Sequence, residues 1–131
     1  MNTDAQMMSQ NKREEMNSHT RVEMLSGPLD GLLFELTKQS IVIGRGDDAD
    51  ISLPDLAASR RHARISYTDG QYWIEDLNSR NGTFINADSR NGKAVGAWKI
   101  TRAKLPYGTI FRVGMSEMRL TRTGPGTDRK V

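Results

Sequence analysis

One arginine and two short polar residues in this sequence have the chemistry to bind a phosphate group. Arg45 stands between Gly44 and Gly46 at the end of an apolar run, and glycine neighbours let a ligand approach the backbone closely. The planar guanidinium carries five donors, which suits two-point capture of a phosphate. Ser59 and Asn81 would add short neutral donors. These residues predict an anion-binding site.

Nucleophilic catalysis is the second chemistry that these residues suggest. Ser59 and His62 are three positions apart, and a serine needs a hydrogen-bonded base to become reactive. No G-x-S-x-G turn surrounds Ser59, and the sequence offers no third, orienting group. In a loop, such a pair more often holds the loop's shape through a hydrogen bond. We therefore expect a protein that is not an enzyme.

A nucleotide or metal cofactor is also not expected. Residues 41–49 formally match a strand followed by G-x-G-x-x-A. That fingerprint needs a helix to receive the pyrophosphate, yet residues 50–54 have the pattern of a short strand, and three nearby aspartates would repel phosphates. The chain has no cysteine, and its two histidines, His19 and His62, lie far apart in the sequence.

The fold that must position these residues is predicted to be all-β. With 131 residues, of which 36% are hydrophobic and 27% charged, the chain has the size and composition of one globular domain. Short apolar runs separated by Gly, Pro, Asn and Asp predict about eleven strands and no helix-length amphipathic segment. Asp69-Gly70 is the clearest turn, because this dipeptide tolerates the positive φ of a two-residue hairpin. The runs are 21–25, 32–36, 40–43, 50–53, 63–67, 72–77, 83–85, 94–100, 103–105, 109–113 and 117–121.

The two ends of the chain and one internal stretch are predicted to lie outside the strands. Residues 1–19 are polar without a regular apolar period and predict a disordered tail, residues 20–123 the folded domain, and residues 124–131 a flexible C-terminus. Residues 86–93 are expected to form an exposed excursion. No apolar window is long enough for a membrane span and no secretion signal is evident, so we expect a cytoplasmic protein.

Several motifs, taken in order, resemble the forkhead-associated (FHA) domains. The resemblance runs from about Arg21 to Arg122. Each motif is common alone, but their order and spacing together are specific. The matching segments are Ser26-Gly27-Pro28, Ile43-Gly44-Arg45, Ser59-Arg60-Arg61-His62-Ala63, Trp73-Ile74-Glu75-Asp76-Leu77, Ser79-Arg80-Asn81-Gly82-Thr83, Asn86 and Tyr107-Gly108-Thr109-Ile110-Phe111-Arg112-Val113-Gly114.

The resemblance implies an eleven-stranded β-sandwich of FHA type that binds phosphothreonine peptides with loops gathered at one end. Arg45 and Ser59 would hold the phosphate, and Arg60 would add a contact to it. Asn81 would bond the peptide main chain. Arg80 would face the phosphate or the residues that follow the phosphothreonine. The implied role is phosphorylation-dependent protein–protein interaction in signalling of the bacterial Ser/Thr kinase type.

Three further residues would shape this site by the same resemblance. Gly44 and His62 would shape the part of the site around Ser59, and His62 would brace the loop that carries Ser59. Gly82 would permit the turn that presents Asn81. Two features depart from the family pattern. The polar stretch 86–96 is longer than in many members, and Ala57-Ala58 places small side chains where the third residue after the phosphothreonine is expected. Charge selection at that position would then depend on Arg80 or Arg60.

Three other hypotheses remain open at this stage. Residues 91–131 carry 9 basic and 2 acidic side chains, a net of +7 (9 − 2), which would suit nucleic acid. That reading is disfavoured, because two of the three aromatic residues there, Tyr107 and Phe111, fall in strand patterns and only Trp98 would be left for stacking. The second hypothesis is that the protein is an adaptor that has kept the fold and lost phosphate recognition. The third is binding of the chain's own N-terminal tail, phosphorylated at Thr3 or Thr20.

Overall fold

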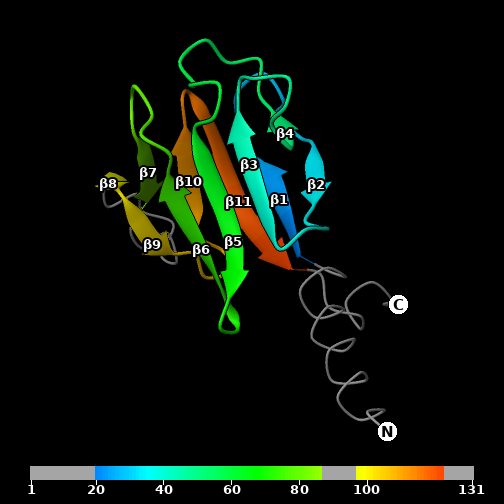
Figure 1. The fold of residues 1–131 in the computed structure, drawn as a ribbon. Coiled ribbons are helices and arrows are strands. Elements are labelled where there is room, and N and C mark those ends of the chain that lie inside the picture. Colours follow the sequence, from blue (N-terminus) through cyan, green and yellow to red (C-terminus); the bar gives the residue numbers. More distant parts are fainter. Residues whose placement is uncertain (1–19, 87–96, 123–131) are drawn as a thin grey trace, which may run out of the picture.

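Eleven β-strands in two sheets make up the part of the chain that the computed structural model describes, residues 20–86 and 97–122 (Figure 1). The predicted tail at 1–19, the C-terminus at 124–131 and most of the excursion at 86–93 lie outside these residues. The strands are β1 (Thr20–Met24), β2 (Leu33–Glu35), β3 (Ser40–Gly44), β4 (Ile51–Ser52), β5 (Ala63–Thr68), β6 (Gln71–Asp76), β7 (Thr83–Asn86), β8 (Ala97–Ile100), β9 (Arg102–Lys104), β10 (Ile110–Val113) and β11 (Ser116–Arg122).

The two sheets face each other as a sandwich. One sheet has the order β2-β1-β11-β10-β7-β8 and the other β4-β3-β5-β6-β9. The strand pairs are antiparallel except for β3 with β4, which run parallel. Each of the eleven predicted runs overlaps a strand, so the prediction of an all-β, eleven-stranded sandwich is confirmed.

Alternating burial along the strands forms the core between the sheets. In β11, Ser116, Met118 and Leu120 are buried while the residues between them are partly exposed, as expected for a strand with one face on a core. Phe111 of β10 and Ile74 of β6 reach the same core from opposite sheets. This packing fixes the register of the strands and therefore the position of the loops that leave them.

The two ends of the sandwich differ in their connections. At one end β5 turns directly into β6 through Asp69 and Gly70, with φ angles of 54° and 78°, which confirms the predicted two-residue hairpin. At the other end lie the longer connections around residues 45–50, 53–62 and 77–82 (Figure 1). Among the described residues, no helix is long and apolar enough to cross a membrane.

Candidate functional site

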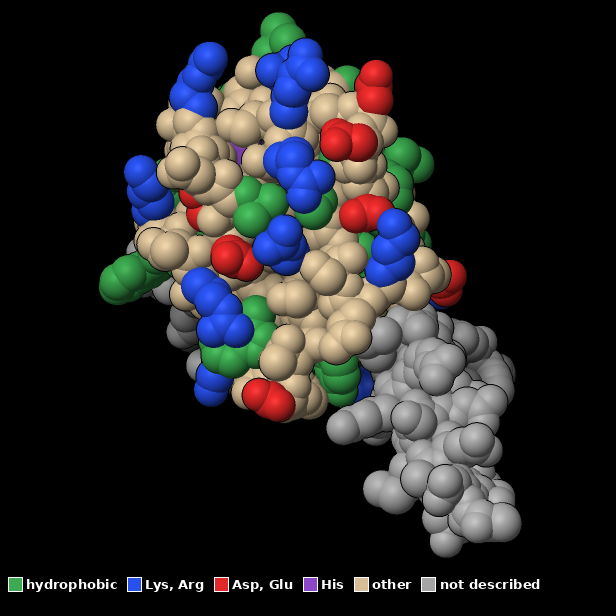
Figure 2. Space-filling model, viewed as in Figure 1, with side chains coloured by type: hydrophobic (Ala, Val, Ile, Leu, Met, Phe, Trp, Pro, Cys, Tyr) green, Lys and Arg blue, Asp and Glu red, His purple; other side chains and the backbone are tan. Residues whose placement is uncertain are grey.

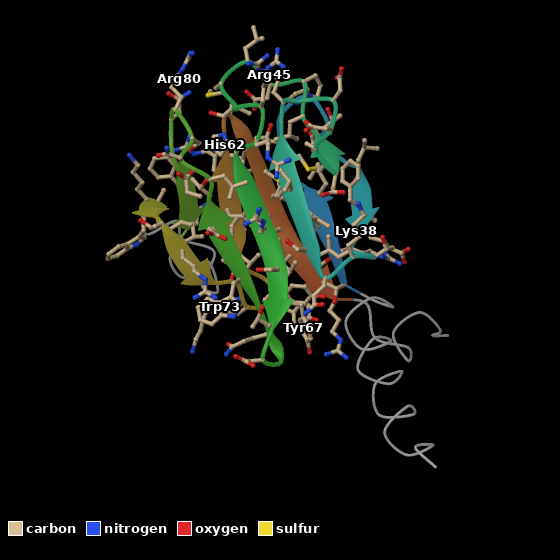
Figure 3. All side chains as sticks on the ribbon, in the orientation of Figure 1. Lys38, Arg45, His62, Tyr67, Trp73 and Arg80 are labelled. Atoms are coloured by element: carbon tan, nitrogen blue, oxygen red, sulfur yellow. The ribbon has the colours of Figure 1, made fainter. Side chains whose placement is uncertain are left out.

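The loops at one end of the sandwich enclose a hollow of about 220 Å³. It contains all five residues predicted to contact the ligand, although they come from three separate connections. Figure 3 shows Arg45 and Arg80 at this end, with His62 below them toward the core. Three arginines and no carboxylate are among the lining residues, so the hollow is suited to an anion. The lining residues are Arg45, Leu56, Ala57, Ala58, Ser59, Arg60, Arg80 and Asn81.

Gly44 brings the loop that carries Ser59 against the end of β3. A Cβ atom at Gly44 would lie 2.1 Å from the Arg60 carbonyl oxygen and 2.8 Å from that of Ser59. This close approach allows the Arg45 N–H to donate to the Ser59 carbonyl at 2.9 Å and the Gly46 N–H to donate to that of Arg60 at 3.0 Å. Only glycine leaves room for this backbone pairing at position 44.

The Arg45 side chain is exposed and partly fixed by the neighbouring loop. Its Nε donates to the Ala58 carbonyl oxygen at 3.1 Å, which uses one of the five guanidinium donors. Among the described residues no carboxylate pairs with Arg45, since the ion pairs there join other residues. The terminal Nη groups are therefore left to bind a ligand.

Ser59 and His62 are not arranged as a nucleophile and its base. The backbone N–H of Ser59, rather than its hydroxyl, donates to His62 Nδ1 at 3.0 Å. The Ser59 hydroxyl oxygen instead accepts the Arg80 N–H at 2.9 Å. With its oxygen used as an acceptor, the hydroxyl can direct its proton at a bound anion.

His62 ties together the two loops that form the hollow. The imidazole is fully buried, and its Nε2 lies 2.8 Å from the Gly82 carbonyl oxygen. Because Nδ1 accepts from Ser59, Nε2 is the nitrogen that carries the proton and donates to Gly82. A buried ring with both nitrogens bonded links residue 59 to residue 82 and supports the predicted bracing position of His62.

A second polar cluster shapes the connection between β6 and β7. Asp76 accepts hydrogen bonds from the Ser79 backbone N–H and hydroxyl and from the Thr83 hydroxyl. Burial raises the pKa of Asp76, but the hydrogen bonds from Ser79 and Thr83 outweigh it and leave the pKa below its ordinary value. The Ser79 hydroxyl oxygen also accepts the Gly82 N–H at 2.9 Å. These bonds present Arg80 and the residue after it at the surface.

Asn81 and Gly82 lie at the tip of this connection. Gly82 has a φ of +88°, a left-handed conformation that favours glycine. The exposed Asn81 carboxamide donates through Nδ2 to the Ala57 carbonyl oxygen at 2.8 Å. Its Oδ1 makes no bond to any other described residue and stays available to a peptide N–H.

Asp55 is a positioning residue that the sequence did not single out. Its carboxylate is buried and accepts the Ala57 and Met115 N–H groups and the Ser116 hydroxyl at 2.7 to 2.9 Å. It therefore attaches the start of the loop that carries Ser59 to the turn between β10 and β11. The dipeptide Pro54-Asp55 signals a turn, but two of the three Asp55 partners, Met115 and Ser116, are 60 and 61 residues away in the chain.

The basic residues of the last third are spread over the sandwich. Arg119 pairs with Glu23 at 3.2 Å, and Arg102 stacks over the Trp73 ring at 4.0 Å. Phe111 is fully buried, as its strand pattern predicted, and cannot stack on a base. Tyr107 is 42% exposed and Trp98 62% exposed. Tyr107 lines a separate hollow of about 480 Å³ with Tyr67, Tyr72 and a single cation, Arg122.

Comparison with known proteins identifies the family of this sandwich. The family model of the FHA domain matches residues 41–114. This range includes the residues that line the hollow. The chain belongs to the FHA domain family. Its motif resemblance is thus confirmed by a match over more than half of its length.

The relatives are longer than this chain. It is 32% identical over 108 residues to the FHA domain-containing protein FhaB of Mycobacterium tuberculosis, covering 82% of this chain and 64% of FhaB. It is 36% identical over 69 residues to the oxoglutarate dehydrogenase inhibitor of Corynebacterium glutamicum, covering 53% of this chain and 48% of that protein. The chain therefore spans under two thirds of the length of these relatives.

Solved structures resemble the sandwich closely. One, from a structural and functional analysis of phosphothreonine-dependent FHA domain interactions, is 32% identical with a TM-score of 0.61 and covers 81% of this chain and 98% of its own. A second structure, the FhaA FHA domain complexed with the intracellular domain of Rv3910, is 32% identical with a TM-score of 0.63. The match covers 77% of this chain and 98% of that one. Both support the two-sheet arrangement seen here.

Proposed function

We propose that this domain is a binding module that recognises phosphothreonine in a partner protein and mediates a phosphorylation-dependent protein–protein interaction. The observation that carries the proposal is the convergence of Arg45, Arg60 and Arg80 with the Ser59 hydroxyl and the Asn81 amide around one hollow without a carboxylate. Phosphothreonine brings a charge of about −1.5 to −2 and three acceptor oxygens. That group matches the donors in charge and number.

Each residue has one part in the proposed contact. Arg45, through its Nη groups, and the Ser59 hydroxyl bind phosphate oxygens, and Arg60 adds a third donor. Asn81 binds the peptide main chain through its carboxamide. Arg80 faces the phosphate or the residues that follow it. Gly44, His62 and Gly82 hold the loops in place without touching the ligand.

The free energies favour moderate affinity. Hydrogen bonds to charged groups contribute roughly 1.5 to 3 kcal/mol each, whereas association and ordering cost about 4 to 15 kcal/mol. Phosphate contacts alone therefore leave little net affinity, and the peptide main chain must contribute. We expect a dissociation constant near the micromolar range, which corresponds to a binding free energy of about −8 kcal/mol. Salt should weaken binding, because the hollow is open to solvent.

One of the similar structures comes from a study of phosphothreonine-dependent FHA domain interactions, which supports the choice of ligand. No observation on the described residues favours catalysis, since the Ser59 hydroxyl does not contact His62. We accordingly infer a binding module that acts where protein kinases act, in the cytoplasm, with residues 20–123 as its folded unit.

Binding of the chain's own tail is the narrower part of the proposal. Thr20 cannot be the modified residue in the folded domain, because it is the first residue of β1, is fully buried and bonds the Tyr107 hydroxyl at 2.9 Å. Thr3 is the remaining candidate in the tail. A chain phosphorylated at Thr3 should bind an external phosphopeptide more weakly than the unmodified chain does. Equal binding would refute self-recognition.

An oriented phosphopeptide library tests the main proposal. Wild-type protein should retain phosphothreonine peptides and release their unphosphorylated counterparts, and the Arg45→Ala variant should retain neither. If duplex or single-stranded DNA bound tightly at physiological salt and binding survived Arg45→Ala, the nucleic-acid alternative would replace this proposal.

A further inference from the structure

Several exposed cations, among them the arginines of the hollow, lack carboxylate partners among the described residues. Lys38 pairs with Asp50, Arg61 with Asp48 and Arg64 with Glu75. Over the described ranges 20–86 and 97–122, no carboxylate lies within ion-pair distance of a second set of cations. That set includes Arg45, Arg60, Arg80, Lys99, Arg102 and Lys104, as well as Arg122 at the opposite hollow. Figure 2 shows Lys and Arg side chains around the loop end and down the margin where β8 and β9 lie in Figure 1.

Lys99 belongs to this set and adjoins the hollow without lining it. It stands in β8 opposite Phe84 of β7, and Ile100 stands opposite Thr83. A Cβ atom built on Gly82 would lie 2.8 Å from Lys99 Cε and 3.4 Å from its Cδ and Cγ. The hydrocarbon stem of Lys99 therefore lies against Gly82, the residue that follows Asn81.

Among the residues that the structure describes, no carboxylate pairs with Lys99. Asp76, the acid of the adjoining connection, is held by Ser79 and Thr83. On the outer face of the same sheet, Arg112 and Lys99 stand on either side of Phe84, with the Arg112 guanidinium 4.4 Å from the ring centroid. Glu117 stands opposite Arg112 in the neighbouring strand. It offsets Arg112 rather than Lys99, which is two strands farther away.

From this arrangement we propose that Lys99, together with Arg80, reads acidic residues that flank the phosphothreonine of the partner on one side. The inference rests on the proposed function, because the phosphate must first be bound at Arg45. A peptide bound there and held by Asn81 passes the turn that Lys99 borders, and carboxylates at that point meet a cation already held against Gly82. The partner is accordingly a phosphopeptide with an acidic flank.

The test compares three phosphothreonine peptides of equal length by fluorescence anisotropy at physiological salt. One has neutral flanks, one has three acidic residues before the phosphothreonine and one has three after it. With wild-type protein, one of the two acidic peptides should bind about three- to tenfold more tightly than the neutral peptide, the range expected for one or two exposed ion pairs.

Variants at Lys99 test whether this residue causes the tighter binding of the acidic peptide. Lys99→Gln should remove most of it and leave the affinity for the neutral peptide within about twofold, and Lys99→Glu should make the same acidic peptide bind more weakly than the neutral one. Lys38→Gln is the matched control, since Figure 3 places Lys38 at the opposite edge of the molecule, and it should preserve the gain.

The outcomes separate this inference from the function on which it rests. If no phosphothreonine peptide binds wild-type protein, the proposed function fails and this inference with it. If the neutral phosphopeptide binds but neither acidic flank tightens binding, or if the gain survives in Lys99→Gln and Lys99→Glu, only the inference is overturned.

Discussion

The two ends of this sandwich carry hollows of very different kinds. The hollow at the hairpin end is the larger, about 480 Å³. Three tyrosines line it, together with Gly70, Gln71, Leu105, Pro106 and a single cation, Arg122. The hollow at the loop end is about 220 Å³ and holds three arginines, a serine and an asparagine. Size alone would select the tyrosine-lined hollow, whereas the distribution of donors and charge selects the smaller one.

The ends also differ in how their backbone is held. At the hairpin end, the turn between β5 and β6 is two residues long and is formed by Asp69 and Gly70 in left-handed conformations. The loop end is irregular, and three buried or partly buried polar side chains hold it, namely His62, Asp55 and Asp76. Irregular backbone near a core must find hydrogen-bond partners outside the sheet ladders, and here those partners also position the binding groups.

Removing the Arg45 guanidinium should give the largest loss of binding. Arg45→Ala should weaken a phosphothreonine peptide at least about 100-fold, because two or more hydrogen bonds to a charged group, roughly 1.5 to 3 kcal/mol each, are lost. Titration calorimetry measures this effect. Since Arg45 is exposed, the melting temperature should change little. A variant with near-normal affinity would contradict the assignment of the phosphate to the loop end.

Replacing one glycine at each end compares a site where a Cβ would meet backbone atoms, Gly44, with one where it would meet nothing within 4 Å, Gly70. Gly44→Ala should cost about 1 to 3 kcal/mol of unfolding free energy and more than tenfold in binding, because the added Cβ meets the Arg60 carbonyl. Gly70→Ala should cost about 1 to 2 kcal/mol, since its φ is +78°, and should leave binding unchanged. Denaturant unfolding and peptide titration measure both. If both variants lost peptide affinity equally, the binding site would not be confined to the loop end.

His62→Phe tests the link between the two loops. Phenylalanine fills similar space but leaves the Ser59 N–H and the Gly82 carbonyl without their partner. Each buried unsatisfied group costs about 1 to 3 kcal/mol, so unfolding free energy should fall by about 2 to 5 kcal/mol. Binding should weaken as the loops separate. Full stability with normal binding would show that the histidine bridge is dispensable.

Acid should weaken the loop end through Asp76. Its folded pKa is lowered, so its stabilising contribution is complete above the ordinary carboxyl value of 3.8 and is lost as the pH falls through the folded pKa. In Asp76→Asn the decline of unfolding free energy below about pH 4 should be shallower than in wild type. Denaturant unfolding at several pH values measures the two slopes. Parallel slopes would remove Asp76 from this account.

Alkali should weaken the opposite end, with the smallest effect. Burial raises the pKa of Tyr72 to about 12, while a hydrogen bond from Thr20 partly opposes the shift. Its contribution is complete below the ordinary value of 10.0 and is lost as the pH rises toward 12. Tyr72→Phe should flatten the decline of stability in that interval. Thermal melts between pH 9 and 12, roughly spanning the two values, supply the comparison with wild type.

Local sequence signals were sufficient for the strands and for one turn. Short apolar runs and the turn residues between them located all eleven strands, and Asp69-Gly70 took the expected angles because its conformation depends on neighbouring residues alone. The observed strand ends differ from the predicted ones by at most three residues. At β8, for example, the run predicted from Ala94 becomes a strand only at Ala97.

The assembly of the site was beyond local signals. Arg45, Ser59 and Asn81 were predicted as binding groups from their chemistry and from the family resemblance, but their shared location depends on sheet order, which apolar patterns do not encode. Asp55 was missed because its partners, Met115 and Ser116, come from a distant turn. The ability of Gly44 to admit the Arg60 carbonyl likewise depends on a tertiary approach.

Backbone amide shifts during titration with a phosphothreonine peptide test the central claim most directly. The account predicts that Ser59, Arg60, Arg80 and Asn81 shift strongly and saturate together, while Gly70 and Gln71 at the tyrosine-lined hollow stay unchanged. The unphosphorylated peptide should shift neither group. Shifts concentrated at the tyrosine-lined end, or equal shifts from both peptides, would contradict the account.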